Sequence, residues 1–140
     1  MNNHYLTYFP RDNNLVSDIA KAIDGEYSAI ACYKKLANIA PTQKAKNVIT
    51  EIRKDEKMHF NVFSNIYTQL TGQKHTPKIT EQCPNEYLAG IDFAFNDEQE
   101  TVDFYLDIAK LTTDPYIKEQ FTRAASDEQN HAVWFLYFLR

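Results

Sequence analysis

The pattern Asp-Glu-x-x-His occurs twice in this chain of 140 residues, and the two copies are 72 positions apart. The first copy places Glu56 three residues before His59, and the second places Glu128 three residues before His131. On an α-helix, residues i and i+3 share a face, so each copy can direct a carboxylate and an imidazole to one point. Such a pair of donors is typical of a metal site, and the repeat indicates two copies of one structural unit.

The repeat extends beyond the two pentapeptides. The same shift of 72 positions carries Glu26 onto Glu98 and Tyr33 onto Tyr105. We therefore predict two helical hairpins, each with a lone Glu on its first helix and a Glu-x-x-His on its second. The chain has only three Gly and five Pro. Because these residues interrupt regular structure, their scarcity favours a few long helices over many short strands.

The sequence predicts an all-α protein with one domain over residues 1–140, built as an antiparallel four-helix bundle. Apolar residues recur at steps of three and four, as on the buried stripe of a helix. Thr42 is a suitable N-cap, Gly72 a suitable end, and Asp114-Pro115 a strong helix start. The four predicted helices span about 13–39, 42–71, 85–111 and 114–140.

Two segments lie outside these helices. Residues 1–12 have aromatic side chains without helical period, and we expect an extended N-terminal arm there. The polar stretch 73–84, with two prolines, predicts a long crossover between the hairpins 13–71 and 85–140. His4 and His75 lie in these segments and are expected to be bystanders.

The stripes of the four helices bring four carboxylates to one level of the core, those of Glu26, Glu56, Glu98 and Glu128. An unpaired buried carboxylate normally takes up a proton, and neighbouring like charges raise its pKa further. Two divalent cations would balance the four charges and leave His59 and His131 as neutral ligands. Carboxylate oxygens with imidazoles suit Fe or Mn better than Zn, and this ligand set is that of di-iron and di-manganese carboxylate bundles.

Four further residues are candidates for supporting roles. Asp55 and Asp127 each precede a His by four residues, within reach of its second ring nitrogen, where a carboxylate would fix the tautomer. Tyr33 and Tyr105 follow the lone Glu residues by two helical turns and can donate phenolic hydrogen bonds near the site. The alternative for the two Asp is a solvated helix face, and for the two Tyr it is plain core packing.

Other features argue against several classes of partner and site. The net charge of −4 gives no reason to expect nucleic acid, and no basic run or long apolar segment indicates a membrane. Cys32 and Cys83 form no Cys-x-x-Cys pair, which excludes a zinc ribbon or rubredoxin-type site, and Cys32 is expected to pack as a small apolar residue. A reducing, cytoplasmic setting is the expectation.

Asp24-Gly25-Glu26 with Tyr33 and Ala37, followed by Asp55-Glu56-x-x-His59, resembles the ferritin-like superfamily, and most closely its rubrerythrin branch. The resemblance covers nearly the whole chain and implies a ferritin-like bundle with a di-iron site. It implies that Glu56 and Glu128 bridge the metals, that Glu26 and Glu98 are terminal ligands, and that each metal takes one His.

The chain differs from rubrerythrins in two ways. Rubrerythrins usually carry another Glu three residues after the ligand on helix three, where this chain has Thr101. They also commonly have a C-terminal rubredoxin domain, and this chain lacks the paired cysteines that such a domain needs. The ligand set is therefore closer to the symmetric six-residue site of bacterioferritins and manganese catalases.

The expected function is a di-iron oxidoreductase, a peroxidase or ferroxidase that reduces peroxide or dioxygen while Fe(II) is oxidised. An external electron donor would restore the metal. The alternatives are a di-manganese catalase and an iron-binding, storage or structural protein with little turnover. The aromatic N-terminal arm would suit packing in an oligomer such as a homodimer.

Overall fold

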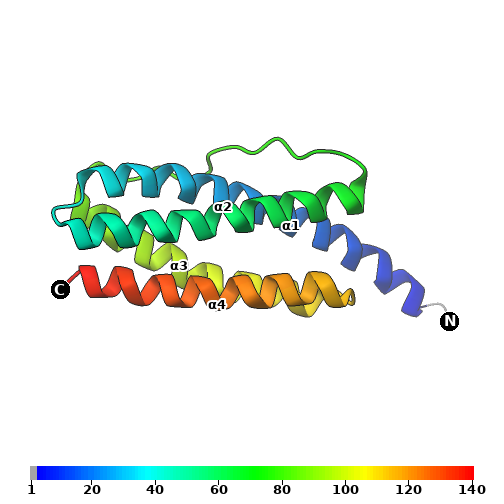
Figure 1. Ribbon diagram of the computed structural model, residues 1–140. Coiled ribbons are helices and arrows are strands. Elements are labelled where there is room, and N and C mark those ends of the chain that lie inside the picture. The colour runs from blue at the N-terminus through cyan, green and yellow to red at the C-terminus, as the bar shows by residue number, and fades with distance from the viewer. Residues whose placement is uncertain (1–2) are drawn as a thin grey trace.

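The computed structural model describes the main chain of residues 3–140 and the side chains from Asn14 onward. It is a bundle of four long helices (Figure 1), whose bounds are α1 (Asn3–Ile39), α2 (Gln43–Thr71), α3 (Tyr87–Leu111) and α4 (Pro115–Phe138). Each neighbouring pair in the bundle is antiparallel: α1 with α2, α3 with α4, α1 with α3, and α2 with α4. The all-α bundle with a long crossover is the architecture predicted from the sequence.

The helix ends follow the local signals in the sequence. Thr42 caps α2 by accepting a hydrogen bond from the amide of Ala45, and Gly72 ends it with a φ of 74°, a conformation that glycine adopts readily. Asp114 accepts hydrogen bonds from the amides of Tyr116 and Ile117 at the start of α4. Helix α3 begins two residues later than expected, after Glu86, whose side chain makes no capping bond.

The extended N-terminal arm expected for residues 1–12 is wrong from Asn3 onward, because α1 already begins there. This segment contains no glycine, and only Pro10 resists helix, so the chain gains main-chain hydrogen bonds by continuing the helix backward. The predicted packing of its aromatic side chains, and His4, lie outside the described side chains.

The core consists of two apolar clusters with a polar layer between them. One cluster surrounds Phe63, Tyr105 and Phe121, and the other surrounds Tyr33 and Phe135. The polar layer holds six buried side chains, each at most 5% exposed: Glu26, Glu56, His59, Glu98, Glu128 and His131. These are the residues that the duplicated pattern placed at mid-height, and their burial between apolar clusters makes charge compensation necessary.

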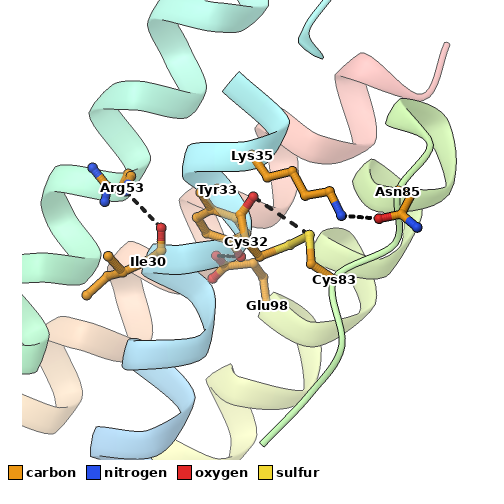
Figure 2. The surroundings of a disulfide bond; sticks show 8 residues. All are labelled: Ile30, Cys32, Tyr33, Lys35, Arg53, Cys83, Asn85 and Glu98. Atoms are coloured by element: carbon orange, nitrogen blue, oxygen red, sulfur yellow. Dashed lines mark hydrogen bonds between the residues drawn. A yellow bond between two sulfur atoms is a disulfide. The ribbon is translucent and has the colours of Figure 1, made fainter. Parts of the chain in front are cut away.

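The two cysteines are joined, contrary to expectation. Cys32 on α1 and Cys83 near the end of the crossover form a disulfide across a sequence separation of 51 residues (Figure 2). Sequence spacing could not show this, because the two cysteines meet only when the crossover runs back along α1. No helix in the described part of the chain is long and apolar enough to span a membrane.

Candidate metal centre

All four helices contribute one glutamate to the polar layer, and α2 and α4 each add a histidine. The donor atoms form two groups, in each of which the atoms lie within 4.8 Å of one another. The first group is Glu26, Glu56, His59 and Glu128, and the second is Glu56, Glu98, Glu128 and His131. Glu56 and Glu128 belong to both groups, so these two residues join two adjacent positions for a cation.

The first position is centred on Nδ1 of His59. This atom lies 3.3 Å from Oε2 of Glu26, 3.2 Å from Oε1 of Glu56 and 3.3 Å from Oε1 of Glu128. Ligands about 2.1 Å from one octahedral ion are about 3.0 Å from each other. The observed separations are therefore close to those of atoms that share one ion.

The second position repeats this arrangement around Nδ1 of His131. The nitrogen lies 3.7 Å from Oε1 of Glu56, 3.5 Å from Oε2 of Glu98 and 3.5 Å from Oε2 of Glu128. Glu128 thus turns one oxygen to each histidine, and Glu56 turns one oxygen toward both. Glu56 and Glu128 therefore face both histidines, whereas Glu26 contacts His59 and Glu98 contacts His131.

The unsatisfied polar atoms of the core test whether these residues fit metal ions. Within the described side chains, six buried side-chain atoms have no hydrogen-bond partner: one Oε1 from each of the four glutamates and Nδ1 from each of the two histidines. A buried polar atom without a partner costs about 1–3 kcal/mol, and more when it is charged. All six atoms are on the six residues of the two groups, so cations bound between these residues would compensate a layer that lacks partners.

The outer nitrogen of each histidine is held by an aspartate from the opposite hairpin. Nε2 of His59 lies 2.8 Å from Oδ2 of Asp127, and Nε2 of His131 lies 2.8 Å from Oδ2 of Asp55. From the sequence, each Asp was predicted to contact the His of its own helix, and that pairing is wrong. With Nδ1 turned into the core, Nε2 points away from its own helix toward the facing one, where the other copy's Asp stands.

The two tyrosines are exchanged between hairpins in the same way. The hydroxyl of Tyr33 donates to Oε2 of Glu98 at 2.7 Å, and the hydroxyl of Tyr105 donates to Oε2 of Glu26. Burial raises the pKa of both phenols well above the ordinary value, so both remain protonated donors. Each hairpin therefore orients the lone glutamate of the other.

The electrostatics of the layer show how strongly it attracts positive charge. Burial, with the neighbouring carboxylates, raises the pKa of Glu56 and Glu128 well above the usual range. For His131, burial opposes the charged form, but hydrogen bonding to Glu98 and nearby carboxylate charges raise its pKa to about 10. Glu56, Glu128 and the two imidazoles therefore hold protons more tightly than usual whenever no metal neutralises the layer, whereas, despite burial, the pKa of Glu98 is lowered by its hydrogen bonds and by the charge of His131.

Two hollows reach the layer from outside. A cavity of about 50 Å³ between α1 and α3 touches all four glutamates and is also lined by Gly25 and Thr101. Thr101 has no carboxylate to offer a cation, and its hydroxyl donates to the main-chain carbonyl of Asp97 at 2.7 Å. A wider groove of about 740 Å³ between α2 and α4 reaches His59 past Met58 and Phe63. No pattern in the sequence predicted that Gly25 lines this cavity.

These features define a class: a four-helix bundle with two adjoining buried clusters of carboxylates and histidines that could hold metal ions. The chain matches the rubrerythrin family over residues 19–139, and it belongs to that family. It is 51% identical to the "Uncharacterized protein YhjR" of Bacillus subtilis (strain 168), over 97% of each chain.

Solved structures share the fold at low sequence identity. A hypothetical protein from Pyrococcus furiosus superposes with a TM-score of 0.79 at 20% identity, covering 89% of this chain and 87% of that one. A protein from Anabaena variabilis with DJ-1/ThiJ/PfpI-like and ferritin-like domains gives a TM-score of 0.76 at 17% identity, covering 92% of this chain and 40% of that one. Both comparisons support the ferritin-like fold.

Proposed function

We propose that this protein is a di-iron oxidoreductase that reduces peroxide or dioxygen. The observation that carries the proposal is the pair of four-residue groups that share Glu56 and Glu128. Glu56 and Glu128 would hold two cations side by side, and such a pair would supply two electrons for the reduction of one small oxidant. Membership of the rubrerythrin family supports the same proposed function.

The donor set suits iron, the metal of this proposal, and equally manganese, the alternative. Four carboxylates and two imidazoles are hard or intermediate donors without any thiolate, which suits Fe or Mn. Two divalent ions would also cancel the four carboxylate charges of the layer. Bound there, the ions would supply the redox electrons, while the protein supplies geometry and a dry surrounding.

The size of the cavity beside the glutamates supports a small oxidant. A volume of about 50 Å³ is enough for a few water-sized molecules, given that one water needs about 10–15 Å³ by the same measure. Peroxide and dioxygen fit this space, whereas a bulky organic substrate does not. An external electron donor would then restore the reduced metals.

The residues around the ligands have defined tasks in this proposal. Asp127 and Asp55 accept the Nε2 proton of His59 and His131, which leaves each Nδ1 lone pair free for a metal. Tyr33 and Tyr105 donate to the terminal carboxylates and fix which oxygen turns inward. The proposed setting is the cytoplasm, where a disulfide is reversible instead of permanent.

Stopped-flow mixing of the anaerobic Fe(II)-loaded protein with peroxide or dioxygen tests the proposal. We expect oxidation faster than that of free Fe(II) in the same buffer, and a loss of this advantage in Glu128→Ala. Glu51→Ala is the matched control, because Glu51 is an exposed glutamate on α2. Oxidation no faster than that of free iron would reject the proposal.

The same preparation separates the alternative functions. Repeated turnover that requires a reductant supports the peroxidase. Oxygen release from peroxide without any reductant, by the Mn(II)-loaded protein, would identify a di-manganese catalase. Accumulation of a ferric mineral would identify an iron-storage role.

A further inference from the structure

The crossover loop is attached to a single stripe of α1. The loop runs beside this helix in the same direction, between the end of α2 and the start of α3 (Figure 1). The α1 side chains that hold it are spaced by four, four and three residues, so they lie in one row along the helix. In order they are Asp24, Ser28, Cys32 and Lys35.

The first half of the loop is held by hydrogen bonds to buried side chains of α1. Asp24 is 6% exposed, and its Oδ1 lies 2.9 Å from Nε2 of His75 and accepts the amide of Lys78 at 3.1 Å. Ser28, also buried, accepts the amide of Thr80 at 2.9 Å. These bonds do not depend on the cysteines, so this half has its own attachment.

The second half of the loop depends on the disulfide. Beyond Thr80, the described covalent and polar contacts between loop and α1 are the Cys32–Cys83 bond, the contact of the Cys83 sulfur with the carbonyl of Cys32, and a hydrogen bond from Lys35 to Asn85 (Figure 2). The Lys35–Asn85 contact is exposed, and exposed polar contacts of this kind contribute little to stability. Cutting the disulfide would therefore release this half while the first half stays in place.

The disulfide lies next to the residues that position one of the glutamates. Cys32 directly precedes Tyr33, whose hydroxyl donates to Glu98 (Figure 2). A cavity of about 10 Å³ beneath the loop is lined by Cys32 and Tyr33 together with Glu81 of the loop and Asp97 of α3. The loop end that the disulfide secures therefore covers the Glu98 side of the metal centre.

We propose that Cys32 and Cys83 are a reversible thiol–disulfide site, reduced by a thiol reductant and oxidised by peroxide, whose state sets how firmly the loop holds the Tyr33–Glu98 side of the metal centre. The link to metal retention rests on the proposed dinuclear site. The thiol chemistry and the loop release do not rest on it. The site would let the same oxidant that reacts at the metals also tighten the protein around them.

The different exposure of the two cysteines indicates the order of the chemical steps. Cys83 is partly exposed, whereas Cys32 is 4% exposed. A reductant thiolate attacks Sγ of Cys83 and expels the Cys32 thiolate, and a second reductant thiol then frees Cys83 and leaves as the oxidised disulfide. For closure, the Cys83 thiolate attacks peroxide, breaks its O–O bond and gives a sulfenic acid and hydroxide, which takes up the proton that the thiol had lost; the Cys32 thiol then attacks the sulfenic sulfur and releases a second water as the disulfide forms.

Thiol labelling of the folded protein, read by mass spectrometry, tests the redox step. We expect two alkylated cysteines after treatment with a dithiol in native buffer, and none after equimolar peroxide is added back following removal of the dithiol. Cysteines that become reducible only in denaturant, or thiols that peroxide does not close into the disulfide, would overturn the proposal. This readout does not require metal.

Hydrogen exchange and metal release test the coupling. On reduction, we expect amide exchange in residues 81–86 and at Tyr33 to accelerate at least tenfold, while residues 75–80 remain protected. We also expect the loaded metal to pass to a chelator several-fold faster. Exchange that is equal in both redox states would overturn the coupling.

Two variants keep the interpretation secure. Cys32→Ala with Cys83→Ala should show the fast exchange of the reduced protein with or without reductant. His75→Gln should loosen the first half of the loop and leave the response to reductant intact. If the protein binds no metal but the thiol and exchange results hold, the proposed function fails and the redox site stands. If the protein binds metal but neither the thiols nor the exchange rates respond to reductant, the redox site fails and the proposed function stands.

Discussion

When no metal is bound, the protein is predicted to lose stability as the pH rises from 6.5 to 9. The pKa of His131 is about 10 in the folded protein, against 6.5 for an ordinary histidine, because hydrogen bonding to Glu98 and carboxylate charges outweigh the effect of burial. A raised pKa means that the folded state binds the proton more tightly than the unfolded chain. Its stabilising effect is complete below pH 6.5 and is lost as the pH approaches 10.

The magnitude follows from the pKa of this one group. His131 contributes about 4 kcal/mol to stability at pH 6.5 and about 1.4 kcal/mol at pH 9, a loss of about 3 kcal/mol. The pKa values of His59 and Glu56 are also raised, and that of Asp97 is raised to about 8, so all three act in the same direction. Asp127, whose pKa is lowered, titrates below this window.

Urea unfolding at pH 6.5 and pH 9 checks the prediction, with chelated protein compared with Mn(II)-loaded protein. Metal holds the ligands deprotonated, so the loaded protein has no such protons to lose and should depend much less on pH. His75→Gln is a suitable control, because it removes a histidine outside the centre. Stability of the chelated protein that stays constant or rises between these pH values would refute the electrostatic description of the layer.

Three further predictions concern single features of the fold. Asp127→Asn should weaken metal binding about 10-fold to 100-fold, measured by competition with a chelator, because it perturbs the partner of His59. Phe63→Ala should lower the free energy of unfolding by about 3–5 kcal/mol, since this ring is 1% exposed and its centroid lies 4.1 Å from that of Phe121. Reduction of Cys32–Cys83, which closes a separation of 51 residues, should cost about 4 kcal/mol in denaturant unfolding; a change below about 1 kcal/mol would contradict the role given to this bond.

The duplicated pattern was enough to predict both the bundle and the six buried residues of the centre. A spacing of three residues on a helix places Glu56 beside His59 whatever surrounds them. Both residues also lie on the apolar stripe of α2, which faces the core. The long helices followed from the spacing of apolar residues and from caps such as Thr42 and Asp114. Local rules of this kind depend only on the chain within a few turns.

The errors concern contacts between segments that are distant in sequence. Asp55 was assigned to the histidine of its own helix, yet it holds His131, because the direction of an imidazole depends on what its other nitrogen faces. The disulfide of Cys32 depends on the path of the crossover, which no local spacing encodes. Residues 3–12 were predicted to be extended because their aromatic residues do not recur with the period of a helix. The absence of such a period means only that a helix there has no continuous apolar face, and it does not prevent the helix from forming.

The metal content of the purified protein tests the central claim most directly. After anaerobic loading with Fe(II) or Mn(II) and removal of free metal, elemental analysis should give two ions per chain for the wild type and for Glu51→Ala. The double variant Glu56→Ala, Glu128→Ala should hold less than half as much, because both shared carboxylates are gone. Fewer than one ion per chain in the wild type, or equal binding by the double variant, would contradict the dinuclear centre.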